Sequence, residues 1–259
     1  MSKAAKACLA CRTPAALFPF TMAFQPIIDV ETQRIDAHEA LVRGPDGEGA
    51  QSVLDQVDAE TIYAFDQACR VKAIELAARL GMTTQLNINF MPNAVYEPRA
   101  CILRTLQAAA RSGFPLDRLT FEFVENEHIV DVAHTQAIIT EYRRHGFRIA
   151  LDDFATGYSG LLRLAELKPD IIKIDRGLVR GCDQDRVRRA ILASLVGLCA
   201  ELGIKVVAEG VERAAEVATL RAMGLRYMQG FYFSRPVFEG LAAQEVARRT
   251  LCDEFVMNS

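Results

Sequence analysis

The sequence predicts an α/β fold, a TIM-like (β/α)8 barrel with an antiparallel first strand. The first observation is that short apolar runs rich in Ile, Val, Leu and Phe alternate with segments of helical periodicity. The second is that five of these runs end in a carboxylate or its amide, and a sixth carries a lysine. The third is size, because 259 residues, 51% of them hydrophobic, suit one barrel and fit two small domains less comfortably.

The elements follow in order along the chain. We expect a strand at residues 22–30 and an antiparallel partner at 34–42, because the turn at 31–33 is too short for a parallel crossover. A glycine-rich loop follows at 44–49. Helical periodicity, with Gly81 as the first stop, predicts helices at 59–80, 98–111, 132–145, 185–202, 213–223 and 238–249. Strands fill the intervals, the last at 226–229. We expect one domain over residues 21–259 and an irregular leader at 1–20.

Composition excludes several classes of function. The net charge of −3 gives no basic excess for binding a nucleic-acid polymer. No apolar stretch approaches the roughly 20 residues that span a bilayer, so we expect a cytoplasmic protein without a membrane segment. The seven cysteines are an odd number without framework spacing, which favours reduced thiols. Cys8 and Cys11 have the spacing of a metal or redox pair, but no second pair or nearby histidine completes a zinc site.

Alternation along the strands predicts where the polar side chains point. Glu122 lies between two phenylalanines and therefore faces the opposite side of its strand. Asn87 and Asn89 share one face of theirs, and Asp152 opposes Leu151. Because the apolar faces must pack against outer helices, these polar groups point to the barrel axis near the carboxyl ends of the strands. Barrel enzymes place their chemistry at that end.

The residues gathered there indicate a site for two divalent cations. Hard oxygen donors without converging His or Cys favour magnesium or manganese over zinc, and two such ions form the usual clamp for phosphodiester hydrolysis. Lys173 could orient the attacking water or stabilise negative charge. Asn87 is an alternative to Asn89 as a metal ligand. The expected ligands are Glu39, Asn89, Glu122, Asp152 and Asp153, with Glu209 and Gln229 completing the ring. A single strand-end acid is often a solvated rim residue, so the signal lies in the whole set.

Eight sequence blocks, in order from about residue 22 onward, resemble those of EAL domains, phosphodiesterases that cleave the bacterial second messenger cyclic di-GMP. The signature tripeptide is Glu39-Ala40-Leu41. The other blocks are Gln25-Pro26-Ile27, Asn89, Glu122-Phe123-Val124-Glu125, the run from Asp152 to Ser159, Lys173-Ile174-Asp175, Glu209-Gly210-Val211-Glu212 and Gln229-Gly230-Phe231. The chain departs from many relatives at Ala155, where they have glycine.

The resemblance implies a role for each of these residues. Glu39, Asn89, Glu122 and Asp152 would hold one Mg²⁺ or Mn²⁺, and Asp152 and Asp153 a second, with Glu209 assisting directly, through water or as general base. Lys173 would position the water, with support from Gln229. Arg43 would grip a substrate phosphate, Gln25 would lie beside a guanine, and Leu41 would also contact the substrate. Glu125 would anchor the loop at 153–159. The resemblance also implies linear pGpG as product and a homodimer.

Two other functions remain open at this stage. A catalytically silent relative could bind cyclic di-GMP or a protein partner without turnover, although no metal ligand and no lysine of the motif is missing. A different barrel enzyme could use Lys173 as a Schiff-base nucleophile, but a ring of carboxylates around the lysine argues against this. An unidentified regulatory protein could supply the input signal.

Overall fold

The structure is a computed structural model that describes residues 18–58, 60–92, 95, 97–124, 131–154 and 160–247. Its strands form one sheet in the order β2-β3-β4-β5-β6-β7-β8-β1-β9, which closes into a barrel because β2 also pairs with β1. The strands are β1 (Thr21–Asp29), β2 (Arg34–Arg43), β3 (Gln85–Phe90), β4 (Leu119–Val124), β5 (Arg148–Phe154), β6 (Ile171–Ile174), β7 (Lys205–Ala208), β8 (Tyr227–Met228) and β9 (Val237–Phe238). Neighbours from β2 to β8 are parallel, whereas β1 is antiparallel to β2 and β8. The fold class predicted from the sequence is confirmed.

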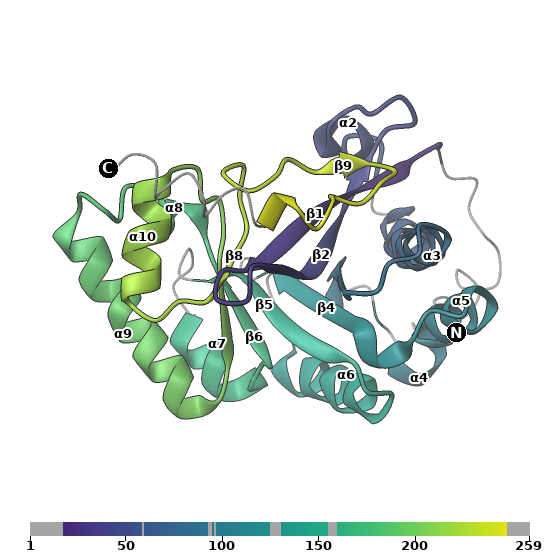
Figure 1. Ribbon diagram of the computed structural model, residues 1–259. Coiled ribbons are helices and arrows are strands. Elements are labelled where there is room, and N and C mark those ends of the chain that lie inside the picture. Colours follow the sequence, from purple (N-terminus) through teal and green to yellow (C-terminus); the bar gives the residue numbers. More distant parts are fainter. Residues whose placement is uncertain are drawn as a thin grey trace.

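Helices surround the barrel, as Figure 1 shows, with α3 and α5 on one side and α9 and α10 on the other. The longest are α3 (Ile62–Arg79), α6 (Val132–Arg144) and α9 (Arg186–Leu202), all close to the predicted bounds. The others are α2 (Ala50–Leu54), α4 (Pro98–Cys101), α5 (Leu103–Ser112), a 3-10 turn (Leu116–Arg118), α7 (Gly160–Leu167), α8 (Arg176–Val179) and α10 (Ala214–Ala222). Within the described ranges, none of these helices combines the length and apolar character needed to cross a membrane.

The prediction of a helix that begins at residue 238 is wrong. Val237 and Phe238 form β9, which pairs antiparallel with Phe24 and Ala23 of β1. The backbone N–H of Glu239 continues this pairing to the carbonyl of Met22, and Glu239 itself has a positive φ of 44°. Because β1 offers an edge that must be paired, the chain adds a strand there. Helical conformation appears only at residues 246–247, at the end of the described part.

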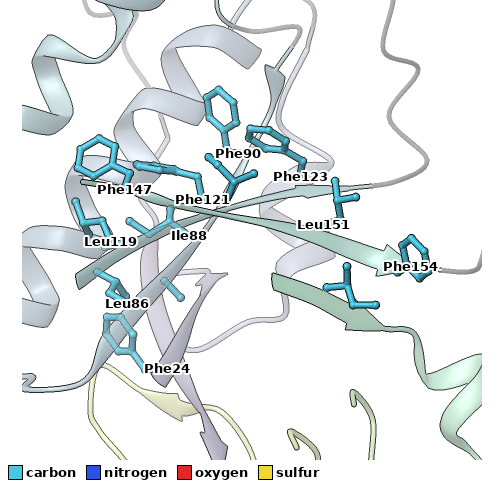
Figure 2. Close-up of a cluster of buried hydrophobic side chains, with 14 of the residues drawn as sticks. Phe24, Leu86, Ile88, Phe90, Leu119, Phe121, Phe123, Phe147, Leu151 and Phe154 are labelled. Carbon is cyan, nitrogen blue, oxygen red and sulfur yellow. The ribbon is translucent and has the colours of Figure 1, made fainter. Parts of the chain in front are cut away.

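Most of the hydrophobic core lies between the sheet and the helices. Phe90 packs against Phe123 with ring centroids 5.1 Å apart, and Phe121 packs against Phe147 at the same separation (Figure 2). Tyr142 of α6 lies 4.9 Å from Phe121 and closes this aromatic layer from outside. The alternation of β3 and β4 therefore places the apolar side chains outside the barrel, as predicted.

A second, smaller apolar cluster fills the inside of the barrel below the site. Ala37, Ala150, Ile171 and Val207 each stand two residues before a candidate site residue, namely Glu39, Asp152, Lys173 and Glu209. Residues two apart on a strand share one face, so each strand carries an apolar side chain at its lower level and a polar one above it. The inner cluster closes the barrel from below, which leaves the polar level open only toward the carboxyl ends of the strands.

The described segments contain four of the cysteines. Cys69, Cys101, Cys182 and Cys199 are free. Cys8 and Cys11 lie outside the described residues.

Candidate functional site

Lys173 stands at the centre of the polar level. Its side chain is 1% exposed, and its Nζ atom lies 2.7 Å from Glu209, 2.9 Å from Glu122, 3.0 Å from Asp152 and 3.1 Å from Glu39. An ammonium group has three N–H donors, so it cannot donate to four carboxylates at once. Asp152 Oδ1 accordingly lacks a hydrogen bond although it is buried. The strands thus bring together more carboxylates than one lysine can serve.

Two amides complete the ring around Glu39. Asn89 donates to Oε1 of Glu39 over 3.1 Å, and Gln229 donates to Oε2 over 2.8 Å. Gln25, on the neighbouring β1, accepts from Gln229 over 3.2 Å and donates to the carbonyl of Ser234. Glu39 is therefore held by donors from strand ends on both sides of it.

A bulge in β5 lets Asp152 and Asp153 serve the same site. Adjacent residues of a regular strand face opposite sides, but the pairing of β5 with β6 shifts register between Leu151 and Phe154. Asp153 takes a left-handed φ of 52°, which is uncommon for a residue other than glycine. The site consequently contains three carboxylate oxygens within 4.8 Å of one another, one from each of Asp152, Asp153 and Glu209.

The mouth of the site is a cavity of about 240 Å³ between the strand ends. Arg176 and Glu212 form an ion pair of 2.8 Å on its rim. Phe231 is 49% exposed there, with the guanidinium of Arg235 4.3 Å from its ring centroid. The mouth therefore offers an aromatic face and charges of both signs to a ligand.

Comparison with known proteins assigns the chain to a family. The model of the EAL domain matches residues 18–236. The chain belongs to the EAL domain family. A crystal structure of a standalone EAL protein from Vibrio cholerae, in a form bound to cyclic di-GMP, superposes with a TM-score of 0.85. The two sequences are 49% identical, over 88% of this chain and 97% of that one.

Other EAL proteins are similar over the same region. BlrP1 from Klebsiella pneumoniae, solved as a manganese and cyclic di-GMP complex, is 35% identical over 89% of this chain and 59% of its own, with a TM-score of 0.83. The antirepressor BluF of Escherichia coli is 31% identical over 85% of this chain and 55% of its own length. The cyclic di-GMP phosphodiesterase NbdA of Pseudomonas aeruginosa is 28% identical over 83% of this chain and 28% of its length. The chain thus spans about half or less of these curated relatives.

The carboxylates of this EAL domain form two overlapping groups that could hold cations. Glu39, Glu122 and Asp152 present oxygens within 4.8 Å of one another, and Asp152, Asp153 and Glu209 do the same. Because Asp152 belongs to both groups, two cations bound there would share it. The ligand atoms are all oxygens, which suits Mg²⁺ or Mn²⁺. The single ammonium of Lys173 leaves most of the negative charge of these carboxylates uncompensated.

Shifted pKa values reflect this excess charge. Burial raises the pKa of Glu209 to about 8, against the attraction of Lys173 and with the repulsion of Asp152. Burial likewise raises the pKa of Glu122 well above its usual range, although Lys173 attracts its charge. Burial and the charge of Asp152 raise the pKa of Asp153. For Glu39 burial is outweighed by Lys173 and the two amides, which hold its pKa below the usual value. Burial and mutual repulsion therefore disfavour the charged forms of Glu209, Glu122 and Asp153 when no cation is bound.

The structure brings most of the predicted site residues together. Leu41 and Arg43 lie further along the inward face of β2 and are half-buried, but neither lines the cavity. The Arg43 guanidinium donates to the carbonyl of Val42, and burial lowers its pKa while Glu39 opposes this. Glu125 and the loop residue Ala155 lie outside the described residues.

The sequence reasoning missed Arg176 and did not single out Phe231 as a lining residue. Arg176 directly follows the Lys173-Ile174-Asp175 block, and Gly210 makes room for it, because a Cβ on Gly210 would lie 2.4 Å from Cγ of Arg176. That glycine, followed two residues later by Glu212, was the available signal.

Proposed function

We propose that this EAL domain hydrolyses one phosphodiester bond of cyclic di-GMP to give linear pGpG, and so lowers the level of the second messenger. The carrying observation is the set of carboxylates around Lys173, which come from the ends of four strands and exceed the available positive charge. The similarity to structures that contain cyclic di-GMP, at 49% and 35% identity, supports the substrate.

The metal ligands proposed are those of the two carboxylate groups. Glu39, Asn89, Glu122 and Asp152 would hold one Mg²⁺ or Mn²⁺, and Asp152 and Asp153 the other, with Glu209 beside it. Such ions polarise the phosphate, lower the pKa of a bound water and neutralise developing charge. Asn89 is preferred to Asn87 because it is half-buried and contacts Glu39, whereas Asn87 lies deeper.

The remaining catalytic and binding roles belong to other side chains of the site. Lys173 points its ammonium into the carboxylates, where it can orient the attacking water and stabilise negative charge. Glu209 can accept the proton of that water, and the departing ribose oxygen would take up a proton from the solvent. Gln229 holds Glu39 and Gln25, and Gln25 would contact a guanine. Leu41 and Arg43 would contact the substrate, Arg43 through a phosphate, and Glu125 would anchor the loop at 153–159.

The test incubates the purified protein with cyclic di-GMP and Mg²⁺ or Mn²⁺ and separates the nucleotides. We expect pGpG from the wild type, none with EDTA, and a loss of at least about 100-fold for Glu39→Ala and Lys173→Ala. Glu31→Ala is the matched control, because Glu31 is exposed in the turn after β1, at the opposite end of the barrel. Full activity of either site variant would overturn the assignment.

One relative favours a second candidate function. BluF, which matches 85% of this chain, is an antirepressor rather than a named phosphodiesterase. The chain could accordingly bind cyclic di-GMP or a protein partner without turnover, and the same incubation separates the two functions, since tight binding without pGpG identifies a receptor. We also expect a homodimer, which sedimentation of the purified protein can measure.

A further inference from the structure

The two asparagines on the inward face of β3 lie at different depths. Asn89 is half-buried and contacts Glu39, near the mouth. Asn87 stands two residues earlier, which is about 7 Å further from the mouth along the strand, and is 1% exposed. Its Nδ2 atom donates to Oε1 of Glu122 over 2.7 Å. Asn87 therefore approaches the carboxylate cluster from below.

The hydrogen bond from Asn87 fixes a carboxylate that has no contact with solvent. Glu122 is fully buried, and its two oxygens face different donors: Oε1 faces Asn87, and Oε2 faces Lys173 at 2.9 Å. Lys173 is shared among four carboxylates, whereas the amide of Asn87 donates to Glu122. The rotation of the Glu122 carboxylate is consequently set by Asn87, and this rotation decides which oxygen is presented to Glu39 and Asp152.

The oxygen of the Asn87 amide shows that packing alone does not account for an asparagine at this position. Oδ1 of Asn87 is buried without a hydrogen-bond partner, as is Oγ1 of Thr120, which stands in register opposite Asn87 on β4. Burying a polar atom without a hydrogen-bond partner costs free energy. An apolar side chain of similar size would avoid that cost. The amide is explained by what its nitrogen does for Glu122.

We propose that Asn87 is a positioning residue for the metal centre, which holds the Glu122 carboxylate in the orientation that binds a cation without itself being a ligand. This inference rests on the metal site of the proposed function. Groups that orient metal ligands typically contribute 10- to 100-fold in metal affinity. We therefore expect Asn87→Ala to weaken Mn²⁺ binding by about 10- to 100-fold. At saturating Mn²⁺ the KM for cyclic di-GMP should be unchanged.

The experiment titrates Mn²⁺ into the protein without nucleotide, followed by calorimetry or by the electron paramagnetic resonance of free Mn²⁺. Asn87→Ala is compared with Asn87→Asp, which keeps the size of the side chain but sets an acceptor against the acceptor Oε1 of Glu122. We expect the Asp variant to lose at least as much affinity as the Ala variant. Thr120→Val is the matched control, because its hydroxyl contacts no partner, and should stay within about twofold of the wild type. Thermal unfolding in EDTA shows which variants are folded.

The outcomes separate this inference from the proposed function. If the wild type binds Mn²⁺ but releases no pGpG, the proposed hydrolysis is wrong, and the Asn87 variants still decide the present inference. If a folded Asn87 variant, either Ala or Asp, binds Mn²⁺ as tightly as the wild type, the positioning role is overturned while hydrolysis can stand. Absence of Mn²⁺ binding by the wild type overturns the inference and the metal site together. Equal losses in Thr120→Val would also overturn it, because they would assign the effect to packing of this layer.

Discussion

Replacing Lys173 with methionine should destabilise the protein strongly when no metal is present. Methionine keeps most of the length of the side chain but leaves four carboxylates, all within 3.1 Å of the former ammonium, without their shared cation. Removing one partner of a buried ion pair costs about 3–5 kcal/mol. For a domain of this size that lowers the melting temperature by about 6–20 °C.

The assay is thermal unfolding in EDTA, and Lys205→Met is the matched control. Lys205 stands on the adjacent strand β7 and pairs with the single carboxylate of Asp36, where both side chains are partly exposed. Burial lowers the pKa of Lys205 in spite of Asp36, so its charge is not favoured there. Its removal should cost about 1 kcal/mol or less. Equal losses for the two variants would refute the idea that the site concentrates uncompensated charge.

Two further readouts follow from the same variant. Mn²⁺ should raise the melting temperature of Lys173→Met more than that of the wild type, because a bound cation replaces the missing charge and binding to the folded state stabilises it. Without Lys173 the carboxylates hold protons to higher pH in the folded state than in the unfolded chain. Stability falls with rising pH wherever the folded state binds more protons. The gap between variant and wild type in EDTA should therefore widen as pH rises; a gap that narrows contradicts the reasoning.

Three other predictions test separate parts of the structure. Burial raises the pKa of Glu209 from 4.5 to about 8 in the folded protein. As pH increases across this window, the stability of the metal-free protein should therefore fall and its affinity for Mn²⁺ should rise. Calorimetry in two buffers should detect the proton that Mn²⁺ binding releases. Asp29 is buried, but its hydrogen bonds with Arg226 and Thr32 lower its pKa from 3.8 to about 2. Asp29→Asn should therefore lose roughly 2 kcal/mol of stability at pH 7. Urea unfolding should find this loss shrinking between about pH 4 and pH 2, because the carboxylate of the unfolded wild-type chain takes up its proton there before the folded one does. Gly230→Ala would place a Cβ 2.0 Å from the carbonyl oxygen of Val211; the backbone beside Gln229 must shift, so stability and hydrolysis should both fall, whereas Gly49→Ala meets no atom within 4 Å and should be neutral in both assays.

The alternation of side chains is what made the polar level predictable from sequence. A residue two positions from a small or aliphatic inward residue shares its face, so Ala37 and Ile171 place Glu39 and Lys173 toward the axis. The short turn between β1 and β2 makes that pair antiparallel, as predicted. Periodicity and turn length are local properties, and they sufficed for the fold and for the convergence of the side chains.

Features that depend on non-local pairing or on an unusual backbone could not be predicted in this way. The sequence predicted that Asp152 and Asp153 serve one site, but it did not predict the bulge in β5 and the left-handed conformation of Asp153 that bring them together. The strand β9 has only two residues and forms because β1 presents a free edge, so the helical pattern after residue 238 gave the wrong element. The position of Arg176 at the cavity depends on the absence of a Cβ at Gly210, a contact between the first residue of α8 and the segment after β7.

Strand β4 shows how the fold tolerates the negative charge of the candidate site. Its inward face carries Glu122, which is fully buried and destabilising as an anion, while its outward face carries Phe121 and Phe123. Fully burying a phenylalanine stabilises a protein by about 1.5–3 kcal/mol, so two of them contribute roughly as much as breaking a buried ion pair would cost. Both rings also contact Phe90 of β3, the strand that supplies Asn87 and Asn89. The aromatic layer outside therefore holds in register the two strands whose inward side chains meet at Glu122, and positioning of that carboxylate depends on packing on the opposite face of the sheet.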